Sequence, residues 1–256
     1  MTLSGALTQA GSITIDVASG KTLTYSGAAV SLGAYTLTMS GEGRLSNTNA
    51  LVLNNASSKL LLDSITVDNV STSADNSGLD VDDNSTLSSL TVAHTTPVSI
   101  ASGKTLSGAI TVTAGSIKLG ETGTLASTVS MSGGTLDADE SLTLSGALTQ
   151  GGNITIDVAE DKTLTYSGDE ISLGANTLTM SGEGTFSNTN ALVLNNASSK
   201  LLLSSSITVD NVSTSSNSLG LDVDDDSTVS SLTVAYTTPV SIASTKTLSG
   251  AITVTA

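Results

Sequence analysis

The residues best suited to chemistry in this sequence form two short acidic runs that share one pattern. The first run reads LDVDDNST from Leu79, and the second reads LDVDDDST from Leu221. Aspartates at alternate positions of a strand point to the same face, where their oxygens could share a Ca²⁺ ion. The pattern therefore predicts a weak calcium site in each run, with these candidate ligands: Asp80, Asp82 and Asn84 in the first, and Asp222, Asp224 and Asp226 in the second.

The same spacing does not form an EF-hand. The sixth position of such a loop needs glycine and the twelfth needs glutamate, but these runs have Ser85 and Ser227 at the sixth position and Thr91 and Thr233 at the twelfth. A solvated acidic turn without metal is the other interpretation that the pattern leaves open.

Catalytic residues are scarce. His94 is the single histidine and Arg44 the single arginine, and a duplicated segment later in the chain has Tyr236 and Thr185 in their places. Nucleophilic catalysis needs a base beside its nucleophile, and polysaccharide cleavage needs clustered carboxylates, commonly with a cationic partner. We therefore expect a protein that is not an enzyme.

Threonine recurs in a Thr-x-Thr pattern that could order water or bind ice if the threonines stacked in columns on one flat face. The spacing of these motifs along the chain is irregular, so threonine as an ordinary outward strand residue is the competing interpretation. The motifs begin at Thr22, Thr36, Thr111, Thr163, Thr177 and Thr253.

Composition narrows the class of protein. The chain has 256 residues, a formal net charge of −15, five aromatic residues and no cysteine. Such an acidic surface repels nucleic acid and anionic lipid, so we expect no nucleic-acid binding. No apolar run approaches the length that spans a membrane, so we expect no membrane insertion in this segment. With so few aromatic side chains, we expect a core of small aliphatic residues in regular repetition.

The chain is internally duplicated. Residues 2–114 align with residues 143–256, first at an offset of 141 and, after one inserted serine in LLLSSSITVD, at an offset of 142. This predicts repeat copy 1 over residues 1–114, connecting coils over 115–142 and repeat copy 2 over 143–256, all in one continuous solenoid. Both ends resemble interior coils, so we expect an excerpt of a longer array that associates head to tail or in bundles.

Short runs within each copy alternate apolar and polar residues, as at Ile13, Ile15 and Val17, and turn-like residues interrupt them about every 20 residues. A coil of that length cannot bury its aliphatic face alone, but it can when stacked on a similar coil. The pattern predicts an all-β fold, a right-handed parallel β-helix (β-solenoid) of about a dozen coils. Tandem β-sandwich domains are the alternative.

Phrases such as ITIDVASGKTLTYSG and SIASGKTLSGAITV resemble the β-helical repeats of bacterial filamentous adhesins, autotransporter passenger regions and long repetitive surface proteins. The resemblance covers the whole chain and implies an extracellular or cell-surface structural repeat, used as an adhesin stalk or a fibre-forming rod. It also implies a host or neighbouring cell surface as a partner. A binding module, for calcium-dependent adhesion or for ice, is the alternative function.

Overall fold

The computed structural model describes residues 1–255, and over this range the chain is all-β and forms a parallel β-solenoid of about 13 turns. Ala256, the last residue of the predicted second copy, lies outside the described range. The predicted fold class is confirmed, and the alternative of β-sandwich domains is wrong because adjacent strands pair in parallel. The described residues include no helix that is long and apolar enough to cross a bilayer.

The chain divides into two compact units, residues 1–128 and 129–256. The boundary falls inside the segment predicted to connect the two repeat copies, so residues 115–128 belong to the first unit and residues 129–142 to the second. The prediction of one continuous solenoid across both copies stays a prediction.

Each unit contains two sets of strands, which we call the B sheet and the A sheet. The B strands of the first unit are β2 (Ile13–Asp16), β5 (Thr36–Ser40), β8 (Lys59–Asp63), β10 (Gly78–Val81), β12 (Thr96–Ile100) and β14 (Ser116–Gly120). Those of the second unit are β17 (Thr135–Ala138), β20 (Ile154–Val158), β23 (Thr177–Gly182), β26 (Lys200–Leu203), β28 (Gly220–Val223) and β30 (Val240–Ile242).

The A strands occupy the rest of each coil. In the first unit they are β1 (Thr2–Leu3), β3 (Thr22–Tyr25), β4 (Val30–Ser31), β6 (Arg44–Asn47), β7 (Leu51–Leu53), β9 (Thr66–Thr72), β11 (Ser85–Val92), β13 (Thr105–Val112) and β15 (Thr124–Leu125). The others are β16 (Thr128–Met131), β18 (Leu142–Leu144), β19 (Leu148–Gln150), β21 (Thr163–Tyr166), β22 (Ile171–Ser172), β24 (Thr185–Asn188), β25 (Leu192–Leu194), β27 (Thr208–Thr214), β29 (Ser227–Val234) and β31 (Leu248–Val254).

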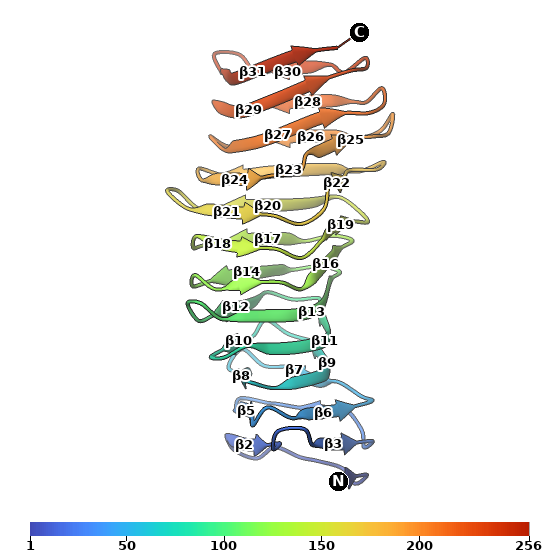
Figure 1. The fold of residues 1–256 in the computed structure, drawn as a ribbon, viewed down its shortest axis with the longest axis vertical. Coiled ribbons are helices and arrows are strands. Elements are labelled where there is room, and N and C mark those ends of the chain that lie inside the picture. Colours follow the sequence, from blue (N-terminus) through green and yellow to red (C-terminus); the bar gives the residue numbers. More distant parts are fainter. Residues whose placement is uncertain (256) are drawn as a thin grey trace. The chain divides into compact units, whose positions relative to one another are not determined.

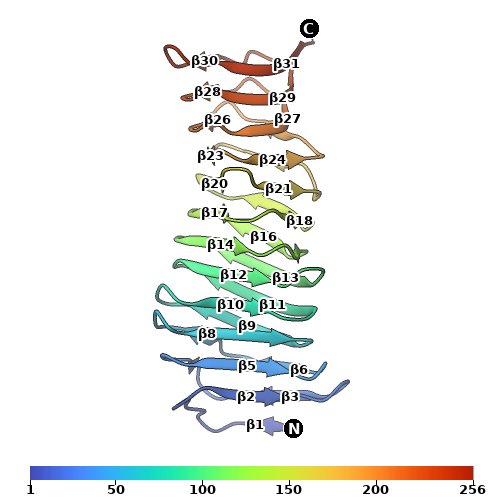
Figure 2. The same ribbon diagram turned by 90° about the vertical axis from the view of Figure 1, so that its left-hand side faces the viewer.

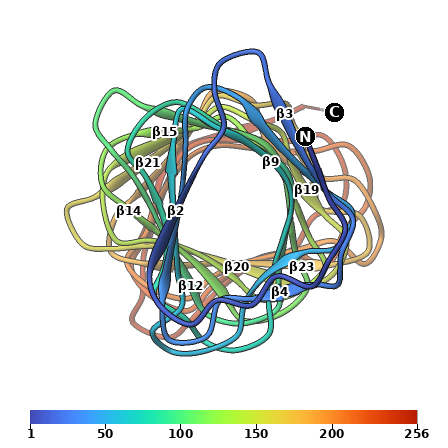
Figure 3. The same cartoon turned by 90° about the horizontal axis from the view of Figure 1, so that it is seen from below.

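Within each unit, a B strand pairs in parallel with the B strand one coil away. Figures 1 and 2 show this stacking for β2, β5 and β8 in the first unit and for β20, β23 and β26 in the second. Seen from the N-terminal end in Figure 3, the path from β2 through β3 to β4 runs clockwise as the chain recedes, so the coil is right-handed. This is the usual hand of parallel crossovers.

Stacking turns the alternation within each strand into continuous ladders in the interior. Leu79 pairs with Leu60 on one side and with Val98 on the other, and all three side chains are 0% exposed. The outward residues between them remain in contact with solvent. The apolar interior is therefore a consequence of coil-to-coil register, because each coil covers the aliphatic side chains of the next.

Three of the five aromatic side chains are buried in this interior, although the composition predicted a core of small aliphatic residues. Tyr25, Tyr166 and Phe186 are 3%, 0% and 0% exposed, and the rings of Tyr166 and Phe186 stack with their centroids 5.9 Å apart. The expectation of a purely aliphatic core is therefore wrong for the coils that contain β3, β21 and β24. Burial also raises the pKa of the Tyr166 hydroxyl.

The long A strands bend partway along, where the coil turns a corner. The register between β11 and β13 shifts between Leu87 and Leu90, and that between β29 and β31 shifts between Thr228 and Ser231. Gly108 lies at the first bend with φ of 118°, and a Cβ atom there would collide with the carbonyl of Leu87. Only glycine combines this left-handed backbone with such a close approach.

We predict that Leu79→Ala lowers the free energy of unfolding by about 2–5 kcal/mol, because a cavity is left between Leu60 and Val98. Leu61→Ala is the matched control, since this leucine lies on the outer face of β8 beside Asp80. Urea denaturation followed by circular dichroism measures both. Equal losses for the two variants would contradict the assignment of inward and outward faces.

Candidate functional site

The acidic runs lie where β10 and β28 end and the chain turns toward the A sheet. Asp80 is on the outer face of β10, and its carboxylate forms an ion pair with Lys59 one coil away. Asp222 forms the same pair with Lys200 at 2.8 Å. Both aspartates are thus bound to a lysine of the adjacent B strand.

The other predicted ligands have different surroundings. Asp82 and Asp224 are exposed in the turn. The side-chain oxygen Oδ1 of Asn84 accepts a hydrogen bond from the backbone N–H of Thr105 at 2.9 Å, and Asp226 Oδ1 accepts one from Thr247 N–H at 2.8 Å. Because asparagine and aspartate make the same bond in the two copies, this position needs an acceptor oxygen and does not need a negative charge.

A third pair of acids was not among the predicted ligands. Asp83 Oδ1 lies 2.8 Å from Lys104 Nζ, and Asp225 Oδ1 lies 2.5 Å from Lys246 Nζ. The hydrogen bond from the lysine is the main cause that lowers the pKa of each aspartate, and the same contact raises the pKa of Lys246. The sequence signal was a lysine 21 residues after each aspartate, which is one coil.

The predicted calcium ligands therefore point to different partners and do not converge on one point. Within residues 1–255, no group of three or more histidine, cysteine, aspartate or glutamate side chains is arranged to hold a metal ion. Calcium prefers six to eight converging oxygens. The calcium site stays a prediction from spacing, to which the geometry adds no coordination shell.

The two residues considered for catalysis also have separate surroundings. The guanidinium of Arg44 forms an ion pair with Asp68, with Nη2 and Oδ1 2.8 Å apart. His94 is half-buried between β11 and β12, and its backbone carbonyl accepts a hydrogen bond from the Thr96 hydroxyl at 3.1 Å. In the part of the chain that the structure describes, no hydrogen bond links the His94 side chain to a serine or an aspartate.

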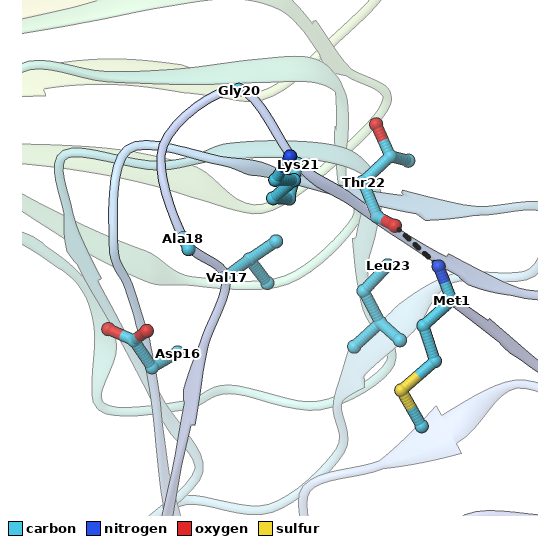
Figure 4. Close-up of a pocket in the computed structure, with 8 residues that line it drawn as sticks. All are labelled: Met1, Asp16, Val17, Ala18, Gly20, Lys21, Thr22 and Leu23. Carbon is cyan, nitrogen blue, oxygen red and sulfur yellow. Dashed lines mark hydrogen bonds between the residues drawn. The ribbon is translucent and has the colours of Figure 1, made fainter.

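One hollow in the first unit deserves comparison with its equivalent in the second. It has a volume of about 470 Å³, and it is lined by Met1 and by residues between Asp16 and Leu23 (Figure 4). The equivalent residues in the second copy contact the preceding coil: Lys162 Nζ lies 2.6 Å from Glu140 Oε2, and Thr163 N–H donates to Ser141 Oγ at 3.0 Å. The hollow of the first copy therefore corresponds to a surface that another coil covers in the second copy.

Comparison with protein-family models, with curated proteins and with solved structures finds no match to this chain. The described residues are therefore characterised by the geometry of the solenoid. That geometry shows ion pairs and acceptor oxygens that join adjacent coils.

We predict that Asp225→Asn lowers the urea midpoint at about pH 7 and that this loss shrinks as the pH falls below the ordinary pKa of 3.8. The pKa of Asp225 is lower in the folded chain than the ordinary value of 3.8, so its pair with Lys246 stabilises the fold above that value. The contribution is lost as pH falls through the lowered folded pKa. The loss at neutral pH will be small because the pair is exposed. A difference between wild type and variant that grows on acidification would contradict the ion-pair assignment.

We also predict that calcium at about 1 mM, the range of weak extracellular sites, leaves the urea midpoint of the wild-type chain unchanged. The reason is that the carboxylates already have lysine and backbone partners. Asp226→Asn serves as the control, since it retains the oxygen that contacts Thr247. A calcium-dependent rise in the midpoint that Asp226→Asn reduces would establish the site that the spacing suggested.

Proposed function

We propose that this chain is a non-enzymatic structural repeat of a long bacterial extracellular or cell-surface protein. It acts as an adhesin stalk or as a fibre-forming rod that holds a partner, such as a host or neighbouring cell, at a distance. The observation that carries the proposal is that the polar and charged contacts described above connect one coil to the next. The charged and polar residues of these contacts hold adjacent coils together, and they do not converge on one point as the residues of a substrate site would.

Three kinds of contact support a mechanical role. Parallel backbone pairing connects every coil within a unit to its neighbours. Ion pairs cross the same junctions on the outside, as between Lys200 and Asp222. The aliphatic ladders fill the inside, at about 1.5–3 kcal/mol for each buried side chain. A force along the stack would therefore act on many contacts at once.

The surplus of acid supports an exterior that stays hydrated. The chain has 23 acidic residues against 8 basic ones, so the lysines that pair with acids leave most carboxylates facing solvent. A high net charge keeps extended proteins soluble and apart. The resemblance of the repeats to those of surface adhesins supports the extracellular location.

Self-association head to tail or in bundles is part of the same proposal. Ile252 and Val254 of β31 are 57% and 75% exposed, whereas the equivalent Ile110 and Val112 of β13 are 1% and 0% exposed. A further coil follows β13, and its strand β15 pairs with Thr105 and Leu106 of β13. A further coil of this kind, from adjoining sequence or from a second copy, would cover the apolar residues of β31.

We predict that a polypeptide of residues 1–256 scatters X-rays as a rod of about 60 Å at low salt, given about 4.8 Å for each coil. Added salt should lengthen the particles, because screening weakens the repulsion between acidic chains. Ile252→Asp combined with Val254→Asp should prevent this lengthening while the circular dichroism spectrum stays that of wild type. A compact particle at low salt would exclude the rod, and strictly monomeric behaviour at high salt would exclude the self-association.

A further inference from the structure

The outer face of the A sheet in the second unit presents a column of threonines. Strand pairing aligns Thr163 with Thr185, Thr185 with Thr208, and Thr208 with Thr228, and Ser249 follows Thr228. We call Thr163, Thr185, Thr208 and Thr228 the threonine column. Its members come from β21, β24, β27 and β29, and they are about 4.8 Å apart because each belongs to the next coil.

A second column of polar side chains runs beside the first, two residues along each strand, and consists of Thr165, Ser187, Asp210 and Ser230. Thr165 pairs with Ser187. Ser187 Oγ donates to Asp210 at 2.7 Å, and Ser230 Oγ donates to the other oxygen of the same carboxylate at 3.1 Å. Two residues of strand span about 6.6 Å. The two columns therefore form a grid with regular spacing in both directions.

Buried side chains in the interior make the grid rigid. The residues that alternate with the threonine column are Leu164, Phe186, Val209 and Val229, and their exposure is between 0% and 1%. These anchors hold each strand in place, and the threonine side chains are stiff because they branch at Cβ. Their methyl and hydroxyl groups are thus held in place before any ligand arrives.

Charge is nearly absent from this face. The A strands of the second unit contain one charged residue, Asp210, and two serine hydroxyls satisfy its carboxylate. The B strands of the same unit carry Asp137, Asp157, Lys200 and Asp222. In a chain with a net charge of −15, the A strands of the second unit thus carry a single ionic group, and two serine hydroxyls already hydrogen-bond to it.

The first copy supplies an internal comparison. Its equivalent column pairs Thr22 with Arg44, Arg44 with Thr66, and Thr66 with Thr86. Arg44 interrupts it with a side chain that is 51% exposed and paired with Asp68. The second copy has Thr185 at the position of Arg44, and only there is the column continuous.

We propose that the threonine column of the second unit, with the hydroxyls of Thr165, Ser187 and Ser230 beside it, binds ice. The repeats of the grid along and across the strands are close to the spacing of oxygen atoms on the prism faces of hexagonal ice. Methyl groups at that spacing order water around themselves, and the adjacent hydroxyls hydrogen-bond to it. Water ordered in this way can join the crystal lattice without rearrangement, whereas an ionic side chain would hold its own hydration shell.

The test is Thr185→Arg, which gives the second copy the residue of the first. The matched control is Thr179→Arg, which places the same side chain on the outer face of the B strand β23. Partition of the labelled chain of residues 1–256 into a growing ice hemisphere, together with thermal hysteresis, measures ice binding. Wild type and Thr179→Arg should enter the ice, and Thr185→Arg should lose this property with an unchanged circular dichroism spectrum.

The reverse variant, Arg44→Thr, should increase thermal hysteresis because it completes the column in the first copy. Exclusion of the wild-type chain from ice would overturn the proposal, and so would equal partition of Thr185→Arg and wild type. Analytical ultracentrifugation of the same variants identifies the competing occupant. If Thr185→Arg abolishes a lateral dimer and wild type does not enter ice, the face binds a second copy of the chain and the ice assignment is wrong.

Discussion

Register between adjacent coils is the constraint on which the rest of the molecule depends. Parallel pairing places Leu37 on Leu60 and Leu60 on Leu79, so each inward residue is covered by a residue of similar shape about one coil later. A slip of one residue would exchange the inward and outward sets along a whole strand. Every apolar ladder in the interior therefore opposes the slip, and the outer columns inherit the same alignment.

The corners preserve this register with side-chain oxygens. A strand that begins a new coil has a backbone N–H that needs an acceptor, and a polar residue of a neighbouring coil supplies it. Asp75 accepts from Thr95 N–H, and its counterpart Asn217 accepts from Thr237 N–H, at 2.9 Å and 3.1 Å. The exchange between acid and amide in the two copies shows that the oxygen is what matters. Hydrogen bonds of this kind at the corners explain much of the Asn, Asp and Ser content of the chain.

The insertion of one serine in the second copy shows how tolerant the corners are. It falls in the turn after β26, and the strands on both sides keep their partners: Leu203 pairs with Val223 as Leu62 pairs with Val81. Turns lie at the surface and tolerate insertions, whereas the ladders cannot shift. Coil length can therefore vary, from 24 residues between Ile13 and Leu37 to 19 between Leu60 and Leu79, without loss of stacking.

The fold class follows from the sequence by itself, because alternation of apolar and polar residues is a local property and the duplicated turns reveal a coil. The strands around Leu37, Met39 and Val67, and the absence of helices from residues 1–255, were predictable in this way. The contents of the outer columns were not. Thr163, Thr185 and Thr208 share no local motif, and they align only because the intervening turns have the lengths and backbone conformations that the tertiary structure shows.

The acidic runs illustrate the same limit. Their spacing predicted that Asp80 and Asp82 share a calcium ion, but in the structure Asp80 forms an ion pair with Lys59 of the adjacent coil. A local sequence pattern does not predict which residue lies one coil away, because the number of residues in a coil depends on the length of every turn between the two partners.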